Sequence, residues 1–186
     1  MRRNRASRSR RRTLWGWHEP LAGAAKALAL ILLLPLAAAR AEDVNTLNPA
    51  YPIVDDRFQV TAEWSIALDQ PYNRAEQGSE LVLFRPGFTI WVSAWPNENG
   101  DSIDQRARWI AAETSRGAYD VVTGSRGPLF RHAFRLDEVK AEGVLQGYFG
   151  YTVAAGGHLQ MAIFFDNQED LATAKSIVES VGYSEP

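Results

Sequence analysis

Apolar and polar residues alternate along several stretches of this chain, and this alternation constrains the fold more than any other feature. Between Phe58 and Leu68, every second residue is apolar, and most of the residues between are polar. Successive side chains of a β-strand point to opposite faces, so this pattern predicts one long strand with a single buried face. The same reasoning predicts further strands at 81–84, 88–95, 119–123, 129–136, 143–154 and 158–166. We therefore expect a sheet of about six or seven strands.

Short turns join these predicted strands, which favours antiparallel pairing. Pro86-Gly87 has the two central residues of a type II turn and predicts a hairpin around it. Gly156-Gly157 predicts a second hairpin later in the chain. The polar residues 73–79 are expected to form a loop, and residues 42–56 an extended lead-in.

Two segments have helical spacing of their apolar residues. Ser102 with Gln105 predicts a capping box at the start of a helix that ends near Gly117. Asn167 is expected to cap a closing helix, whose apolar face includes Ile177 and Val178. Parallel β-α-β repetition is absent, so residues 57–186 are expected to form a single α+β domain with a mainly antiparallel sheet and helices packed on it.

The N-terminal segment has the three parts of a secretory signal peptide. Seven of the first twelve residues are arginine, and an apolar run of 13 residues follows at 27–39. That run is shorter than the roughly 18 residues that a membrane-spanning helix needs. It ends in Ala39-Arg40-Ala41, which fits an A-x-A cleavage site. We expect residues 1–41 to be a signal peptide, cleaved after Ala41, and the protein to be periplasmic or secreted.

Other interpretations of this segment stay open. An uncleaved signal would give the protein its membrane contact. Residues 9–14 also resemble a twin-arginine export signal, although Thr13 stands where that motif favours phenylalanine. A basic arm that binds nucleic acid is disfavoured, because an apolar run follows the arginines and gives such an arm no solvated scaffold.

Cleavage leaves an acidic chain. Residues 1–41 contain nine of the 20 basic residues and one of the 22 acidic residues, so the remaining 145 residues have a formal charge of −10. This charge repels phosphate backbones, and we therefore expect no nucleic-acid partner. The absence of cysteine excludes disulfides, thiol nucleophiles, cysteine-ligated zinc and iron–sulfur clusters.

The order and character of these segments resemble the PsbP-like superfamily, which includes DcrB-type periplasmic proteins. The resemblance rests on an opening strand FQVTAEWSIALDQP, a hairpin ELVLFRPGFTIWVSAW, one helix, a meander and a closing helix AKSIVESV. It covers most of residues 57–183. The resemblance implies an α/β/α sandwich that acts as an accessory or binding subunit without catalytic activity.

Candidate catalytic and metal-binding residues are few. His132 shares the apolar parity of its predicted strand, which favours a hydrogen-bonded core residue over a ligand. His158 follows the Gly-Gly turn, and we expect it at an exposed strand start. Neither histidine has a second histidine or a carboxylate at the spacing of a zinc site, so we expect no metal and no other cofactor.

Two loops resemble functional motifs without matching them. Residues 97–104 place oxygen-bearing side chains at alternate positions, as calcium loops do, but the distal glutamate is missing and a helix start accounts for the same residues. Gly124-Ser125-Arg126-Gly127 is not G-x-S-x-G and precedes a strand, so we interpret it as a turn. The many acidic pairs single out no acid–base dyad.

Aromatic residues and arginines remain as candidate binding residues. Glycines interrupt the predicted strand 143–154, which also carries several aromatic side chains, and such glycines often mark close approach of a ligand. The aromatic residues either pack beneath the helices or line a groove for an apolar ligand or a partner's aromatic anchor. The candidate residues are Trp91, Trp95, Tyr148, Tyr151, Arg131 and Arg135.

From these observations we expect an exported accessory or binding protein without catalytic activity, which contacts an unidentified cell-envelope protein. The alternative is a carrier of a small apolar or amphipathic ligand in a cleft between sheet and helix. A hydrolase built from dispersed residues, such as His132 and the acidic residues, is a third and weaker hypothesis.

Overall fold

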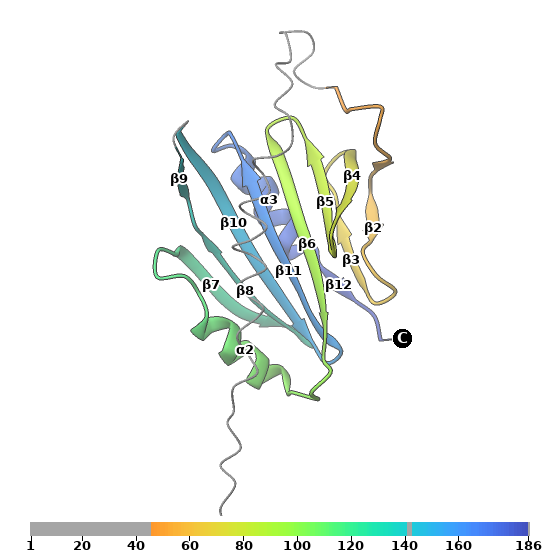
Figure 1. Ribbon diagram of the computed structural model, residues 1–186. Coiled ribbons are helices and arrows are strands. Elements are labelled where there is room, and N and C mark those ends of the chain that lie inside the picture. Colours follow the sequence, from red (N-terminus) through yellow and green to blue (C-terminus); the bar gives the residue numbers. More distant parts are fainter. Residues whose placement is uncertain (1–45, 141–142, 186) are drawn as a thin grey trace, which may run out of the picture. The chain divides into compact units, whose positions relative to one another are not determined.

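A nine-stranded antiparallel sheet is the main element of the computed structural model, which describes residues 46–140 and 143–185 (Figure 1). The described residues all belong to the compact unit Asp43–Pro186. The predicted signal peptide, with its cleavage site at Ala41, lies outside them. Along the sheet the strands are β1 (Ile53–Val54), β4 (Tyr72–Gln77), β5 (Glu80–Arg85), β6 (Phe88–Pro96), β11 (Gly157–Phe165), β10 (Gly143–Ala154), β8 (Leu129–Arg135) and β7 (Tyr119–Arg126), with β9 (Glu138–Lys140) paired to β10.

A second, smaller sheet and two helices pack on this frame. The small sheet has the order β12 (Gly182–Tyr183), β3 (Trp64–Ala67) and β2 (Arg57–Gln59). The helices are α2 (Ile103–Ala112) and α3 (Asp170–Glu179). Neither of the two helices in the described part of the chain is long and apolar enough to cross a membrane. The structure therefore confirms a mainly antiparallel β protein with helices packed against the sheet.

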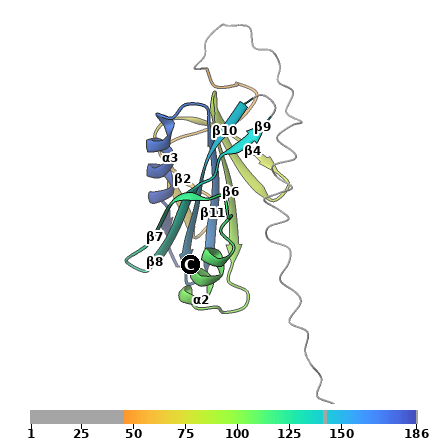
Figure 2. The ribbon, with the colours of Figure 1, turned by 90° about the vertical axis from the view of Figure 1, so that its left-hand side faces the viewer.

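The two helices contact opposite faces of the large sheet (Figure 2). One face, which we call the α3 face, contains Ile90 and Ile163 and packs against α3. Gly150 lies on this face, and a Cβ atom added there would come within 2.5 Å of Val178 on α3. The other face, which we call the α2 face, contains His132, whose ring contacts Thr114 directly after α2. The main hydrophobic core lies on the α3 face.

The predicted strand 58–68 is wrong, because the chain reverses inside it. The backbone N–H groups of Val60 and Thr61 both donate to the carbonyl oxygen of Trp64, at 2.8 and 3.2 Å. This closes a turn between β2 and β3, which then pair antiparallel. The turn contains neither glycine nor proline, and its residues continue the alternation, so the sequence pattern does not show it.

The predicted loop at 73–79 is also wrong. Most of it forms β4, which pairs with β5 through a turn at Gly78, where φ is +65°. The lead-in at 42–56 contributes the short strand β1, which pairs with β4. Together with the division of the predicted strand 58–68 into β2 and β3, and with the short strands β9 and β12, they explain why the two sheets of the described structure contain twelve strands rather than six or seven.

Both predicted hairpins are confirmed. Arg85 pairs with Phe88 across Pro86-Gly87, and Gly87 has the positive φ of +70° that the third position of a type II turn needs. In the second hairpin Ala154 pairs with Gly157, so the turn lies one residue earlier than predicted.

Only one of the two predicted helix caps is present. Ser102 and Gln105 form the expected capping box at the start of α2. Asn167 does not cap α3: the N-cap residue is Glu169, whose side chain makes no capping bond. Asn167 contributes its backbone carbonyl oxygen, which accepts from the N–H of Asp170 at 3.0 Å.

The capping box gives a stability prediction with a matched control. We expect Ser102→Ala to lower the free energy of unfolding by about 1 kcal/mol, because the N–H of Gln105 loses its acceptor. Glu169→Ala changes the equivalent position of α3 and should have little effect. Urea unfolding followed by circular dichroism measures both; equal losses in the two variants would contradict the role of the cap.

Candidate functional site

The six candidate binding residues lie on opposite faces of the large sheet and do not form one groove. On β10, Tyr148 pairs with Arg135 of β8, whereas Tyr151 pairs with His132. Tyr148 and Tyr151 are three residues apart, so their side chains point to opposite faces. The α3 face carries Tyr148, Arg131 and Arg135, and the α2 face carries Trp91, Trp95 and Tyr151.

The two arginines on the α3 face bind groups of the protein itself. Arg131 donates to the backbone carbonyl oxygen of Val181 at 2.9 Å. Arg135 donates to the side chains of Gln146 and Gln168, both at 3.2 Å, and its guanidinium lies 5.0 Å from the centre of the Tyr119 ring. These contacts connect β8 to the segments on either side of α3, through Val181 and Gln168, and to Tyr119 of β7.

Tyr148 is part of the core rather than of a surface. Its side chain is buried within the main hydrophobic cluster. Burial, and then the charge of Glu179, raise the pKa of its hydroxyl to about 12. The position of Tyr148 matches the packing interpretation of the aromatic residues.

Two of the three candidates on the α2 face, Trp95 and Tyr151, lie beside the buried His158. The rings of Trp95 and His158 are nearly parallel, with centroids 6.3 Å apart. Trp109 of α2 and Tyr151 of β10 approach the same histidine at 6.1 and 6.4 Å. Burial raises the pKa of Tyr151 to about 12. Trp95 is 39% exposed, whereas Trp91 is buried and its indole N–H has no hydrogen-bond partner among the described residues.

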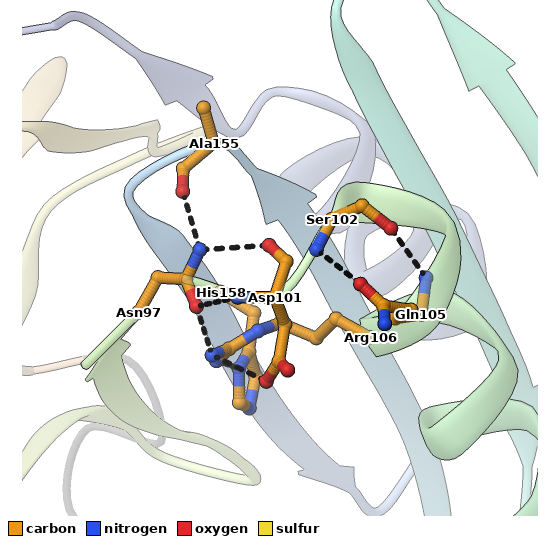
Figure 3. A network of polar contacts seen from close by, with 7 residues as sticks. All are labelled: Asn97, Asp101, Ser102, Gln105, Arg106, Ala155 and His158. Atoms are coloured by element: carbon orange, nitrogen blue, oxygen red, sulfur yellow. Dashed lines mark hydrogen bonds and ion pairs between the residues drawn. The ribbon is translucent and has the colours of Figure 1, made fainter. Parts of the chain in front are cut away.

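His158 belongs to a polar network that joins α2 to the β10–β11 hairpin (Figure 3). Arg106 of α2 donates to Nδ1 of His158 at 2.9 Å and to Oδ1 of Asn97 at 2.8 Å. The side chain of Asn97 in turn donates to the carbonyl oxygen of Ala155 at 2.9 Å. Asp101 completes the network through an ion pair of 3.7 Å with Arg106.

This network keeps His158 neutral. Burial, and then the charge of Arg106, lower the pKa of His158 to about 4. Arg106 has only donors, so Nδ1 accepts and the ring proton lies on Nε2. The prediction of an exposed His158 is wrong, because Arg106 and Trp109, about fifty residues earlier in the chain, cover its ring.

His132 is a hydrogen-bonded core residue, as predicted. Its Nε2 lies 2.8 Å from the hydroxyl of Thr114, and its Nδ1 lies 2.8 Å from the hydroxyl of Thr123. The Thr114 hydroxyl donates to the carbonyl oxygen of Ile110, so Nε2 carries the ring proton and Thr123 donates to Nδ1. Burial lowers the pKa of His132. Both ring nitrogens are therefore engaged by the protein.

The two motif-like loops have structural roles. Asn97 uses its side-chain oxygen to accept from the N–H of Asp101 at 3.0 Å, which closes the loop before α2. Gly124 and Ser125 lie within β7, and Gly127 has a φ of +59° in the turn to β8. Within residues 46–140 and 143–185, no group of three or more histidine, aspartate or glutamate residues is placed to hold a metal ion.

A cavity of about 370 Å³ lies on the α3 face, between the small sheet and the β4–β5 hairpin. Arg74 of β4 stands at its rim, with its guanidinium 5.9 Å from the centre of the Phe58 ring. The guanidinium forms an ion pair with Glu76 at 2.5 Å, but its Nε is buried without a partner in the described structure. The lining residues are Phe58, Val60, Thr61, Arg74, Glu76, Gly78, Ser79, Glu80, Leu81, Val92 and Ala94.

The sequence analysis missed this cavity. Two of its walls come from the turn between β2 and β3 and from β4, which were predicted as one continuous strand and as a loop. One signal could have revealed the wall formed by β4. Arg74 and Glu76 alternate with small or polar residues, and charged residues in such an alternation are typical of a strand near the edge of a sheet.

A second feature is the free edge of the large sheet, which β7 and β9 form together. β7 pairs only with β8, and all eight of its residues are exposed. β9 continues the line of β8 and pairs with β10. Most of the large hydrophobic side chains that are exposed in the described structure lie on these strands and on the start of β10: Tyr119, Val121, Val122, Val139 and Val144.

Comparisons with known proteins assign no family to this chain. No family model matches it, and no curated protein matches it. A crystal structure of a protein from Bacteroides thetaiotaomicron, solved at 1.50 Å resolution, is similar with a TM-score of 0.55 and 10% sequence identity. The similarity covers 70% of this chain and 49% of that protein, so the chain spans about half its length. This similarity shows a shared fold alone; the PsbP-like resemblance, with the α/β/α sandwich that it implies, stays a prediction.

Proposed function

We propose that this chain is an exported binding protein that carries a small amphipathic ligand without chemistry of its own. The observation that supports this most is the cavity on the α3 face. Its volume of about 370 Å³ lies within the range of small-molecule sites. Export rests on the signal-peptide pattern of residues 1–41.

The lining of the cavity indicates the chemistry of the ligand. Leu81, Val92 and Ala94 form an apolar floor that fits a hydrocarbon or aromatic body. The side chain of Arg74 is 40% exposed, so its guanidinium can donate to a carbonyl or hydroxyl oxygen of the ligand. Glu76 forms an ion pair with Arg74, and the carboxylate of Glu80 accepts from Ser93 on the α2 face, so the polar end of the ligand is neutral.

The states of the buried histidines support binding rather than catalysis. Both nitrogens of His132 bond threonine hydroxyls, and Nδ1 of His158 accepts from Arg106. A general base needs a free nitrogen within hydrogen-bond reach of its substrate. The hydrogen bonds of these two histidines instead connect the sheet to α2 and to Thr114, which directly follows it.

Removal of the ligand gives the first test. Protein purified without detergent from its native source should show a small-molecule adduct in native mass spectrometry. After extraction with organic solvent the melting temperature should fall, because a ligand present at 100 times its Kd stabilises the folded state by about 2.7 kcal/mol. An unchanged mass and melting temperature would count against a carried ligand.

A variant that fills the cavity locates the site. N-phenyl-1-naphthylamine, an uncharged amphipathic fluorophore, should bind the extracted protein, and Ala94→Phe should weaken this binding at least about tenfold by occupying the floor. Ala172→Phe, at an exposed position of α3, is the control and should bind the probe normally. Equal affinity in the two variants would overturn the assignment of the cavity.

Contact with a protein partner is a second candidate function, which the exposed hydrophobic residues of β7, β9 and β10 favour. The aromatic candidates are unsuitable for testing it. Trp91 and Tyr148 are buried, so alanine at either position removes packing in addition to any contact with a partner.

A further inference from the structure

We propose that β7 binds an extended, acidic segment of a partner protein, which adds to the large sheet as a further antiparallel strand. The pairing stretch of β7 is residues 122–126. The inference rests on the second candidate function, contact with a protein partner, and gives that function a binding mode and a partner chemistry. It does not involve the ligand cavity.

The outer side of β7 is open to such a strand. In the described structure β7 has β8 as its single neighbour, so every second N–H and C=O pair of its backbone points away from the sheet. All eight of its residues are exposed, including Val122 at 60%. Natural edge strands are usually protected by lysine, proline or a covering segment, and β7 contains neither lysine nor proline. The backbone of β7 therefore fits the recognition mode in which a peptide adds a strand to a sheet edge.

A bulge determines where the pairing stretch begins. The pairing of β7 with β8 shifts its register between Tyr119 and Val122, and Asp120 inside this bulge has a φ of +50°. From Val122 to Arg126 each residue has a partner on β8 in unbroken register. A further strand continues a sheet where the backbone is extended and regular, so Asp120 lies outside the proposed site.

The charge of the β7–β8 hairpin favours an acidic partner. No acidic residue occurs between Asp120 and Asp137 in the sequence, whereas three arginines do: Arg126, Arg131 and Arg135. The pairing register places all three arginines on the α3 face. This edge is thus locally basic, although the chain after the predicted cleavage site has a formal charge of −10. A segment that carries a carboxylate is attracted to this edge, and a basic segment is repelled.

Arg126 is the arginine that a partner can reach. Arg131 and Arg135 donate to groups of the protein itself. Arg126 is exposed, and within residues 46–140 and 143–185 it forms no ion pair and no side-chain hydrogen bond. Burial, and then the charge of Arg126, lower the pKa of Arg131. A carboxylate opposite Arg126 would pair with its guanidinium and offset the repulsion between the two arginines.

The other residues on this face determine the rest of the partner segment. An antiparallel partner runs in the opposite direction, so the residue opposite Arg126 comes first, and those opposite Gly124 and Val122 follow two and four positions later. A Cβ atom added at Gly124 would meet no atom within 4 Å, so the space above it is open. An aromatic side chain of the partner can cover this glycine, and an apolar one can contact Val122. The pattern of the partner segment is therefore acidic-x-aromatic-x-apolar.

A titration with defined peptides tests the proposal. The probe is the acetylated and amidated peptide Glu-Thr-Phe-Thr-Val, which is added to isotopically labelled protein and followed by NMR. We expect saturable shifts of the β7 amides with a Kd on the order of 100 µM, because one short strand makes a small interface. The same peptide with lysine in place of glutamate should bind about fivefold more weakly or worse, because it places like charges opposite one another.

Charge reversal on β7 should invert this preference. Arg126→Glu should bind the lysine peptide at least about fivefold more tightly than the glutamate peptide. Arg108→Glu, at an exposed position of α2, makes the same change of net charge and should keep the preference of the parent protein.

The outcomes separate the proposal from the function on which it rests. Peptide binding at β7 with the same charge preference in Arg126→Glu as in the parent would overturn the acidic partner and leave contact with a protein partner in place. No shift of the β7 amides with either peptide at about 1 mM would overturn both. Fluorophore binding by the same samples reports the cavity independently.

Discussion

Gly157→Ala is expected to lower the free energy of unfolding by about 3 kcal/mol or more. A Cβ atom at this position would lie 2.1 Å from the carbonyl oxygen of Trp95 and 3.1 Å from Cα of Pro96. Both atoms belong to the backbone of β6, which pairs with Gly157, so relief requires the two central strands to separate. The residue also has a φ of +150°, a conformation that L-residues with side chains rarely adopt.

Equilibrium urea unfolding of the variant measures this loss. Gly124→Ala is the matched control, because its added Cβ meets no atom within 4 Å and its φ is ordinary. The control should be neutral or slightly more stable, since alanine restricts the unfolded chain. A Gly157→Ala variant as stable as the control would show that β6 and β11 adjust easily at this end.

Stability should fall by about 3 kcal/mol between pH 6.5 and pH 4, because His158 binds a proton more weakly in the folded chain than in the unfolded chain. Its pKa is about 4 when folded, against 6.5 for an unperturbed histidine. Well above pH 6.5 the residue is neutral in both states and contributes no pH dependence. As the pH falls below 6.5, the unfolded chain takes up the proton first, at about 1.4 kcal/mol per pKa unit. His132, whose pKa is also lowered by burial, adds a loss of the same sign.

Urea unfolding at several pH values tests this prediction. His158→Gln keeps an acceptor for Arg106 but does not titrate, so its stability should depend less on pH over the same range. His132→Gln serves as the comparison and should remove only the smaller contribution. A pH dependence that is the same in His158→Gln as in the parent would exclude His158 as its cause.

The sequence correctly predicted those turns and caps that depend only on residues close together in the chain. The turn at Pro86-Gly87 depends on two adjacent residues, and the capping box depends on Ser102 and Gln105, three residues apart. Both are present as predicted. The turn between β2 and β3 was missed because Val60 and Ala62 continue the alternation, and its closure depends on a backbone bond to Trp64.

The environment of each candidate residue depended on contacts that the sequence does not show. His158 was predicted to be exposed, but Arg106 reaches it from a position 52 residues earlier. The strand pattern could have separated Tyr148 from Tyr151. They are three positions apart on one strand, and residues an odd number of positions apart point to opposite faces of a sheet. The cavity could not be predicted from the sequence, because its walls come from β2, β4 and β6. The relative position of these strands depends on how the two sheets pack.

The strand order also places the cavity and the free edge at opposite sides of the large sheet. Between β6, the cavity strand nearest to that edge, and β7 lie β11, β10 and β8. At about 4.8 Å per strand, this separates the two features by roughly 19 Å. Sites this far apart that share no side chains contribute additively to binding. Occupancy of the cavity and binding of a protein partner at the edge should therefore be thermodynamically independent, so that one chain could hold both at the same time without either displacing the other.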